Sequence, residues 1–322
     1  MPVITSSYKP PFIFKNHHIN TVYKTFFSTE TIIYNRVRIK TNDNDFLDLD
    51  FSIKNAETIV IAMHGLEGSS KSTYIISVIN YLNLNNIDCV AVNFRGCSGE
   101  DNNNAYSYNS GKTDDVSLII NYILTTYNYK NIVLLGYSMG GNITLKYIGE
   151  TSKIPLNVKG AIGISVPCDL EGSSNALSKW HNAIYLNRFM LTLKQKSFLK
   201  LKKFPNCNLT KEAIINAKTF QDFDSAVTAP LFGYKNAQDY WSKCSSKQFL
   251  KEIEHPTLII NALDDSFLSE SCHPYKEAEN NKNLTFEASK YGGHVGFNTS
   301  IIGKDLLWSE KRIVQFIQHI IS

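Results

Sequence analysis

Five continuous apolar runs constrain the fold of this chain more than any other feature of its sequence. They are TIVIAM (58–63), DCVAVNF (88–94), NIVLLGY (131–137), GAIGIS (160–165) and TLIINA (257–262). Strands that are buried on both faces have this pattern, and such strands belong to parallel sheets. Segments with apolar residues at helical spacing separate or follow these runs, at about 72–84, 113–127, 139–150 and 306–320. The sequence therefore predicts an α/β fold, with an open, mostly parallel sheet and helices on both faces.

Two segments before the first run have a different pattern, because their apolar and polar residues alternate. Residues 31–39 (TIIYNRVRI) and 45–51 (DFLDLDF) predict two half-exposed strands that form a hairpin. Between about 168 and 250 the β-α pattern stops, and helical pieces rich in lysine, asparagine and aromatic residues replace it. We expect a single domain over residues 1–322, with 168–250 inserted as a helical cap or lid over the carboxyl ends of the strands. Ligands bind at that edge of such sheets.

Composition argues against several classes of protein. The chain has 322 residues, 33 of them basic and 29 acidic, and a net charge of +4 gives no reason to expect a nucleic-acid partner. The six cysteines form no C-x-x-C pair and no cluster with metal spacing, which predicts reduced thiols in a cytoplasmic protein. We expect no transmembrane helix, because no 18 apolar residues run together, and the first residues do not resemble a secretion signal.

The predicted strand at 131–137 leads into the motif GYSMG (136–140), and helix-forming sequence follows it. In this strand–turn–helix context, G-x-S-x-G is typical of a nucleophile elbow. The glycines let neighbouring backbone pass a strained turn without a Cβ clash, and the helix N-terminus favours negative charge. A glycine-rich turn with a capping serine is the alternative interpretation. In this context we predict that Ser138 is a nucleophile.

A serine hydroxyl is a weak nucleophile unless a base accepts its proton. In hydrolases with this elbow, the acid and then the base follow the serine along the chain. His294 lies in the glycine-flanked segment KYGGHVGF, after a probable strand LTFEAS, and is the predicted base. His319 falls in the last predicted helix and His273 follows the acidic residues too closely, so both suit the role less well.

The acid is expected after the predicted strand 257–262, where the sequence reads LDDSFLS. Asp264 and Asp265 both have this position, and one of them should hold the imidazole tautomer and stabilise the imidazolium. We choose Asp265 and expect Asp264 to cap or hydrogen-bond the loop. The alternative order stays open on the sequence alone.

An oxyanion hole requires two backbone N–H groups, one from the residue after the nucleophile and one from a loop after an early strand. The first belongs to Met139. For the second, HGLEG (64–68) follows the first apolar run, and we predict the N–H of Leu66 as the donor. An ordinary βα loop is the alternative interpretation of HGLEG. This set of residues requires no metal and no organic cofactor.

Several segments resemble those of one family. They are PPFIFKNHHINT (10–21), HGLEGSSKSTY (64–74), NFRGCSGEDNNNAYSYNSGKTDD (93–115), GYSMGGN (136–142), FDSAVTAPLFGYKNAQDYW (223–241), NALDDSF (261–267) and GGHVGF (292–297). Over nearly its whole length the chain is similar to the YheT-like family of α/β-hydrolases, which is related to the animal alpha/beta-hydrolase-domain lipases and esterases. Two departures, Ser266 in place of proline and Trp241 in place of a second tyrosine, remove no catalytic group.

The resemblance implies the alpha/beta-hydrolase fold and a serine hydrolase with the triad Ser138, Asp265 and His294. It also implies a small-molecule or lipid ester as substrate, with short-chain esters or monoacylglycerol-like lipids favoured. Two alternatives stay open: an acyltransferase that uses the same acyl-enzyme, and a binding protein on a retained hydrolase fold. Aromatic residues of the cap are expected to pack its own core or to form an acyl-binding wall. Those singled out are Trp180, Phe189, Phe232, Tyr240 and Trp241.

Overall fold

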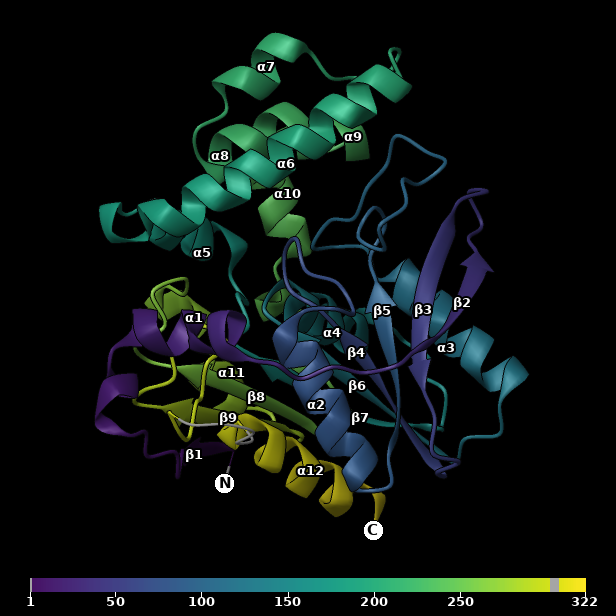
Figure 1. The fold of residues 1–322 in the computed structure, drawn as a ribbon, viewed down its shortest axis with the longest axis vertical. Coiled ribbons are helices and arrows are strands. Elements are labelled where there is room, and N and C mark those ends of the chain that lie inside the picture. The colour runs from purple at the N-terminus through teal and green to yellow at the C-terminus, as the bar shows by residue number, and fades with distance from the viewer. Residues whose placement is uncertain (1, 302–306) are drawn as a thin grey trace.

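The computed structural model describes residues 2–301 and 307–322, and its centre is a nine-stranded sheet (Figure 1). The strand order is β1-β9-β8-β7-β6-β4-β5-β3-β2. The five apolar runs are β4 (Thr58–Met63), β5 (Asp88–Asn93), β6 (Asn131–Tyr137), β7 (Val158–Ile164) and β8 (Thr257–Ala262). These strands pair in parallel and are buried almost throughout, so the prediction of a mostly parallel sheet is confirmed.

The two edges of the sheet differ in how well the sequence predicted them. β2 (Asn35–Lys40) and β3 (Phe46–Ser52) form the predicted antiparallel pair, and β2 starts four residues later than the predicted strand at 31–39. The prediction of a half-exposed second strand was wrong, because all seven residues of β3 are buried between β2 and β5. Its two aspartates are buried in ion pairs, Asp48 with Arg38 at 2.7 Å and Asp50 with Arg36 at 2.6 Å. At the other edge, β9 (Leu284–Ser289) pairs with the short β1 (Val3–Thr5), which was not predicted.

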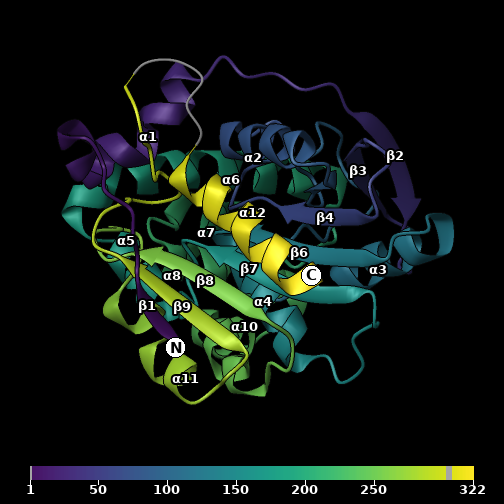
Figure 2. The same ribbon diagram turned by 90° about the horizontal axis from the view of Figure 1, so that it is seen from below.

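Helices cover both faces of the sheet (Figure 2). On one face, α2 (Thr73–Leu84) and α12 (Trp308–Ile321) share an apolar core with the strands. On the other face, α3 (Asp114–Thr126), α4 (Met139–Glu150) and α11 (Tyr275–Glu279) do the same. The helices predicted at 72–84, 113–127 and 139–150 are present, and so is the last one, whose first predicted residue lies outside the described residues.

A group of helices between β7 and β8 lies above the carboxyl ends of the strands (Figure 1). The group contains α5 (Leu170–Leu177), α6 (Ala183–Lys203), α7 (Lys211–Asn216), α8 (Phe220–Phe223), a π-helical turn (Asp224–Thr228), α9 (Ala229–Phe232) and α10 (Ala237–Cys244). Helices α5 to α9 share an apolar core, which also includes Phe267 from the loop after β8, and α10 packs in a separate small cluster with Leu170. We call residues 168–250 the cap. Short 3-10 turns complete the described chain at Phe12–Lys15, Trp180–Asn182, Ser246–Glu252 and Glu270–Cys272.

The topology reverses at β4, because the chain passes from β4 to β5 on one side and then to β6 on the other. Ligands bind at such a switch point, outside the carboxyl ends of the strands. The loop after β4 starts at His64, and Ser138 follows β6. The fold therefore brings two of the predicted site segments together. Among the described helices, none has the length and apolar character that crossing a membrane requires.

Candidate active site

Ser138 lies at the sharp turn between β6 and α4, with φ 51° and ψ −121°. Two neighbouring positions tolerate only glycine. A Cβ on Gly136 would lie 2.3 Å from the carbonyl oxygen of Gly140, and a Cβ on Gly140 would lie 2.5 Å from that of His64. The N–H of Ser138 donates to the carbonyl of Ile164 on β7 at 2.8 Å. The left-handed turn thus has the steric properties of the elbow that the motif indicated.

His294 lies in the loop after β9, and its Nδ1 donates a hydrogen bond to Oδ2 of Asp265 at 2.8 Å. Asp265 follows β8, and its side chain is completely buried, whereas the side chain of His294 is 11% exposed. The imidazole also stacks on Phe267, with ring centroids 4.3 Å apart. Because the carboxylate occupies Nδ1, the other ring nitrogen, Nε2, is the one available for proton transfer.

Ser138 and His294 line the same cavity. Over residues 2–301 and 307–322 there is no hydrogen bond between their side chains. Such bonds are often long or poorly aligned in hydrolases without substrate and tighten when substrate binds. The structure therefore places the predicted nucleophile and base in one cavity and joins the base directly to Asp265.

Asp264 has a different partner from Asp265. Its Oδ1 accepts the N–H of Gly293 at 2.9 Å, in the turn that carries the histidine. Burial raises the pKa of Asp264 to about 6, and the bond from Gly293 opposes this rise. Asp264 thus holds the backbone of the loop, and Asp265 holds the ring of His294.

The loop after β4 passes close to the nucleophile. A Cβ on Gly65 would lie 3.1 Å from the Cβ of Ser138, and the N–H of Gly65 donates to the hydroxyl of Tyr74 at 2.9 Å. Leu66 and Met139, the two predicted oxyanion donors, line the cavity with Ser138. In the part of the chain that the structure describes, neither of their N–H groups has an intramolecular acceptor. Both groups are therefore free to donate to an oxygen atom of a ligand.

His64 is fully buried under this loop. Its Nδ1 lies 2.6 Å from the carbonyl oxygen of Gly65, and its Nε2 accepts the N–H of Phe94 at 3.3 Å. Burial lowers the pKa of His64 to about 4, so the ring is neutral at neutral pH and carries its hydrogen on Nδ1. His64 supports the loop and is not placed to act as a base.

Glu67 connects the same loop to the cap. It has a positive φ of 56°, and its N–H donates to the hydroxyl of Tyr108 at 3.0 Å. Its Oε1 accepts hydrogen bonds from that hydroxyl at 2.6 Å and from Nζ of Lys196, on α6, at 2.8 Å. Sequence reasoning missed these contacts, because they join residues 41 and 129 positions apart. They fix the residue that follows Leu66.

The N-terminal helix α1 (His17–Phe27) holds the loop that carries His294, and sequence reasoning missed this role too. Oγ1 of Thr21 accepts the N–H of His294 at 2.9 Å and donates to the carbonyl of His17 at 2.7 Å. The buried Asn20 bonds to Asn298 through both its side chain and its carbonyl, at 2.7–3.1 Å. Both residues belong to the segment PPFIFKNHHINT, and its resemblance to a family segment was the available signal.

The cavity has a volume of about 160 Å³ and lies between the loops of the sheet and the cap. Its lining includes apolar side chains of the cap: Leu170, Leu177, Phe189, Leu193, Phe220, Phe223, Val227, Leu231, Phe232 and Trp241. The expectation that cap aromatics form a wall thus fits Phe189, Phe232, Tyr240 and Trp241. It was wrong for Trp180, whose side chain is 87% exposed. Within the described residues, no group of three or more His, Cys, Asp or Glu side chains could hold a metal ion.

Asp224 is a buried carboxyl group in the wall of this cavity. Its oxygens accept hydrogen bonds from the hydroxyl of Thr228 at 2.6 Å and from the indole N–H of Trp241 at 2.8 Å. Burial raises the pKa of Asp224 to about 6, and the two hydrogen bonds oppose this rise. The carboxyl group thus connects the π-helical turn to α10.

The raised pKa of Asp224 predicts how stability depends on pH. Between about pH 4 and pH 6 the folded protein keeps a proton that the unfolded chain has released, so this group makes folding less favourable as pH rises through that interval. Relative to an Asp224→Asn variant, we expect the wild-type free energy of unfolding to fall by about 2 kcal/mol between pH 4 and pH 7. Urea unfolding of both proteins at the two pH values measures this difference. Glu212→Gln, an exposed site in the cap, is the control, and parallel pH dependence of wild type and Asp224→Asn would contradict the expectation.

Comparisons with known proteins agree with this architecture. A family model described as "alpha/beta hydrolase fold" matches residues 58–299. A solved esterase from Pyrococcus furiosus superimposes with a TM-score of 0.60 at 15% identity, covering 99% of this chain and 100% of that one. At this identity the likeness shows the fold alone.

Three curated relatives are similar in sequence. The putative esterase YheT of Escherichia coli is 30% identical, over 94% of this chain and 91% of its own length. Phospholipase ABHD3 of Mus musculus is 28% identical, over 100% of this chain and 80% of its own length. Monoacylglycerol lipase of Saccharomyces cerevisiae is 25% identical, over 82% of this chain and 60% of its own length. With these matches, and with an elbow, a buried Asp–His pair and a mostly parallel sheet in place, the chain belongs to the alpha/beta hydrolase family, in its YheT-like branch.

Proposed function

We propose that this chain is a serine hydrolase that cleaves carboxylic esters through an acyl-enzyme. The observation that carries the proposal is the contact of 2.8 Å between the buried Asp265 and Nδ1 of His294, in a cavity that Ser138 also lines. An acid, a base and a strained serine in this arrangement are what nucleophilic acyl transfer requires. The names of the curated relatives, an esterase, a phospholipase and a monoacylglycerol lipase, support esters as the substrate class.

In the proposed mechanism, Oγ of Ser138 attacks the ester carbonyl carbon while Nε2 of His294 accepts its proton. Asp265 stabilises the imidazolium through Nδ1, and the N–H groups of Leu66 and Met139 donate to the oxyanion. The imidazolium then protonates the leaving alcohol, which departs and leaves an acyl-Ser138. Water repeats these steps, with His294 as its base, and releases the acid and the free serine.

The apolar lining of the cavity favours an ester with a hydrocarbon acyl chain. Phe267 stacks on His294, and Leu66 and apolar residues of the cap line the same cavity. We propose that the cap acts as this acyl-binding wall and shields the acyl-enzyme from bulk water. Small-molecule and lipid esters both fit the proposal, and a cytoplasmic location stays a prediction from the sequence.

Labelling by a fluorophosphonate probe, followed by mass spectrometry of the modified peptide, tests the class of activity. The expected result is a phosphonate on Ser138, together with hydrolysis of p-nitrophenyl esters. No labelling at a probe concentration that modifies a known esterase would favour the binding-protein alternative. Product analysis with added alcohol separates hydrolysis from acyl transfer, because an acyltransferase would yield the new ester in preference to the acid.

Replacing Phe189 with alanine is expected to shift the chain-length preference toward longer acyl groups, because its ring lines the cavity from α6. A change of fit by one methylene-sized step is worth about 1–3 kcal/mol in specificity, or roughly 10–200-fold in kcat/KM. The measurement is kcat/KM for p-nitrophenyl esters from acetate to octanoate. Leu191→Ala is the matched control, since Leu191 lies on the same helix with its side chain 60% exposed. An identical profile for wild type and Phe189→Ala would leave the acyl wall without support.

A further inference from the structure

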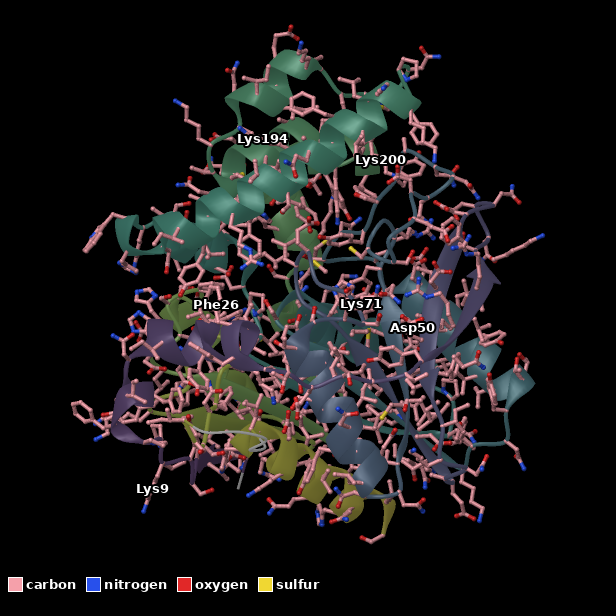
Figure 3. All side chains as sticks on the ribbon, viewed as in Figure 1. Lys9, Phe26, Asp50, Lys71, Lys194 and Lys200 are labelled. Carbon is pink, nitrogen blue, oxygen red and sulfur yellow. The ribbon has the colours of Figure 1, made fainter. Side chains whose placement is uncertain are left out.

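The longest helix of the cap has an unusual charge. α6 (Ala183–Lys203) contains six basic residues and no acidic residue in 21 positions. Figure 3 shows Lys194 and Lys200 on this helix, at the end of the molecule away from Lys9. A helix that is basic and carries apolar side chains on its surface is typical of proteins that lie on membranes. Which side chains face the solvent decides whether α6 fits this class.

Part of the charge on α6 is used inside the protein. Lys196 pairs with Glu67 at 2.8 Å. Lys200 is buried and donates to the carbonyl of Asn104 at 2.8 Å. These lysines face the cavity, together with Phe189 on the same side of the helix. The inner face of α6 therefore belongs to the cavity and to the contact between the cap and the loops.

The outer face of α6 is exposed and mixes apolar with basic side chains. Six exposed residues recur at intervals of three or four positions, which places them along one side of the helix. They are Ile184, Arg188, Leu191, Gln195, Leu199 and Lys202. The side chains of Ile184, Leu191 and Leu199 are 82%, 60% and 54% exposed, and Trp180, just before the helix, is 87% exposed. Among the described residues, Arg188 and Lys202 have no carboxylate partner.

We propose that this outer face, defined by Trp180 and the six residues from Ile184 to Lys202, binds the surface of a membrane that contains anionic lipid. Large apolar side chains enter the boundary between head groups and acyl chains, tryptophan prefers that boundary, and cations attract anionic head groups. A second copy of the chain fits less well, because a symmetric contact through this face would bring basic residues against basic residues and no acidic residue of α6 would oppose them.

The proposal goes beyond ester hydrolysis but gives it a source of substrate. The two faces of one helix contact the cavity and the proposed membrane surface, so a docked protein would hold its cavity about one helix diameter, roughly 10 Å, from the lipid. An ester in the membrane would then have a short path to Ser138. Docking itself requires no catalysis, which makes it separately testable.

Sedimentation with vesicles tests the docking surface. We expect the protein to bind vesicles of phosphatidylcholine with about one-third phosphatidylglycerol at least tenfold more tightly than vesicles of phosphatidylcholine alone, since each cation near an anionic surface contributes roughly fivefold. The variant Arg188→Glu/Lys202→Glu should lose this preference. Ile184→Ser/Leu191→Ser/Leu199→Ser should bind both vesicles at least tenfold less tightly.

The matched control changes residues at the amino ends of the strands, far from the cap. Leu84 and Leu156 are 81% and 90% exposed and precede β5 and β7, and Lys282 precedes β9. Leu84→Ser/Leu156→Ser/Lys282→Glu should bind vesicles like the wild type. All variants should hydrolyse the soluble ester p-nitrophenyl acetate at the wild-type rate, which shows that each one folds.

Two results would overturn the docking surface. One is equal binding of the wild type to both kinds of vesicle. The other is a wild-type dimer, seen by analytical ultracentrifugation, that the α6 substitutions abolish. If the protein binds vesicles but hydrolyses no ester, the docking surface is supported and the proposed function is wrong. In that case melting temperatures replace the ester assay as the control for folding.

Discussion

Ser138→Ala is expected to lower kcat for ester hydrolysis by on the order of 10⁴–10⁶-fold while the protein stays folded. Alanine has no nucleophilic oxygen, and the hydroxyl-bearing neighbour Tyr137 is completely buried and does not line the cavity. The methyl group fits the same turn, so the melting temperature should change little. Initial rates with p-nitrophenyl butyrate and a thermal denaturation curve measure the two effects.

His294→Ala should cost about as much as Ser138→Ala, and the double variant should lose little more, because the two residues act as a unit. Ser174→Ala is the matched control, since Ser174 also lines the cavity but lies within α5 and not at an elbow. Its activity should remain within a few-fold of the wild type. Retention of more than about a tenth of wild-type activity by Ser138→Ala would remove Ser138 from the mechanism, because loss of a triad member costs far more than that.

The sheet was predictable because a strand that is buried on both faces is a continuous run of apolar residues. A strand such as β6 is apolar at every position that faces a helix layer, and no local alternative fits a run of that length. β3 was misread as half-exposed because Asp48 and Asp50 alternate with apolar residues. Arg38 and Arg36, on β2, pair with these two aspartates and allow them to be buried. The pattern of residues within β3 alone does not show which strand lies beside it.

The helix α1 was missed for a related reason. Apolar residues do recur at helical spacing in it, namely Ile19, Val22, Tyr23, Phe26 and Phe27, but the one residue that the fold buries is the polar Asn20. What holds α1 in place is a set of hydrogen bonds to residues more than 270 positions away, among them Thr21 to His294 and Asn20 to Asn298. Hydrogen bonds between residues so far apart form only in the folded chain and leave no pattern in the local sequence. The resemblance of PPFIFKNHHINT to a family segment was the only indication that this part of the chain matters.

The candidate site also has a part that the sequence predicts and a part that it does not. Ser138, Asp265 and His294 could be proposed from the sequence because their order and their positions after predicted strands are restricted by the chemistry. The residues that orient them could not, because Glu67 and Lys196 meet only after the cap has folded over the loop that follows β4. The exposed side of α6 was not predicted either, since Trp180 was expected to pack in the core of the cap or to line an acyl-binding wall.

The two neighbouring aspartates give the sharpest test of the assignment, because they differ in what they touch. Asp265→Asn is expected to lower kcat by roughly 10⁴-fold. The amide of asparagine would present its NH₂ group to the imidazole, so Nδ1 of His294 would have to accept and the hydrogen would move to Nε2. That tautomer has no free lone pair to take the proton of Ser138.

Asp264→Asn should cost less than about tenfold, because the carboxyl of Asp264 bonds to the N–H of Gly293 and the amide oxygen of asparagine can accept the same bond. Below about pH 6 the wild-type group is largely protonated, since burial raises its pKa to about 6, so the two proteins should be most alike at the acidic end of the pH profile. Profiles of kcat against pH for both variants, with melting temperatures to exclude misfolding, measure the difference. The reverse ranking, with Asp264→Asn the weaker enzyme, would move the role of the acid to Asp264 and would mean that the 2.8 Å contact of Asp265 with His294 is not the one used in catalysis.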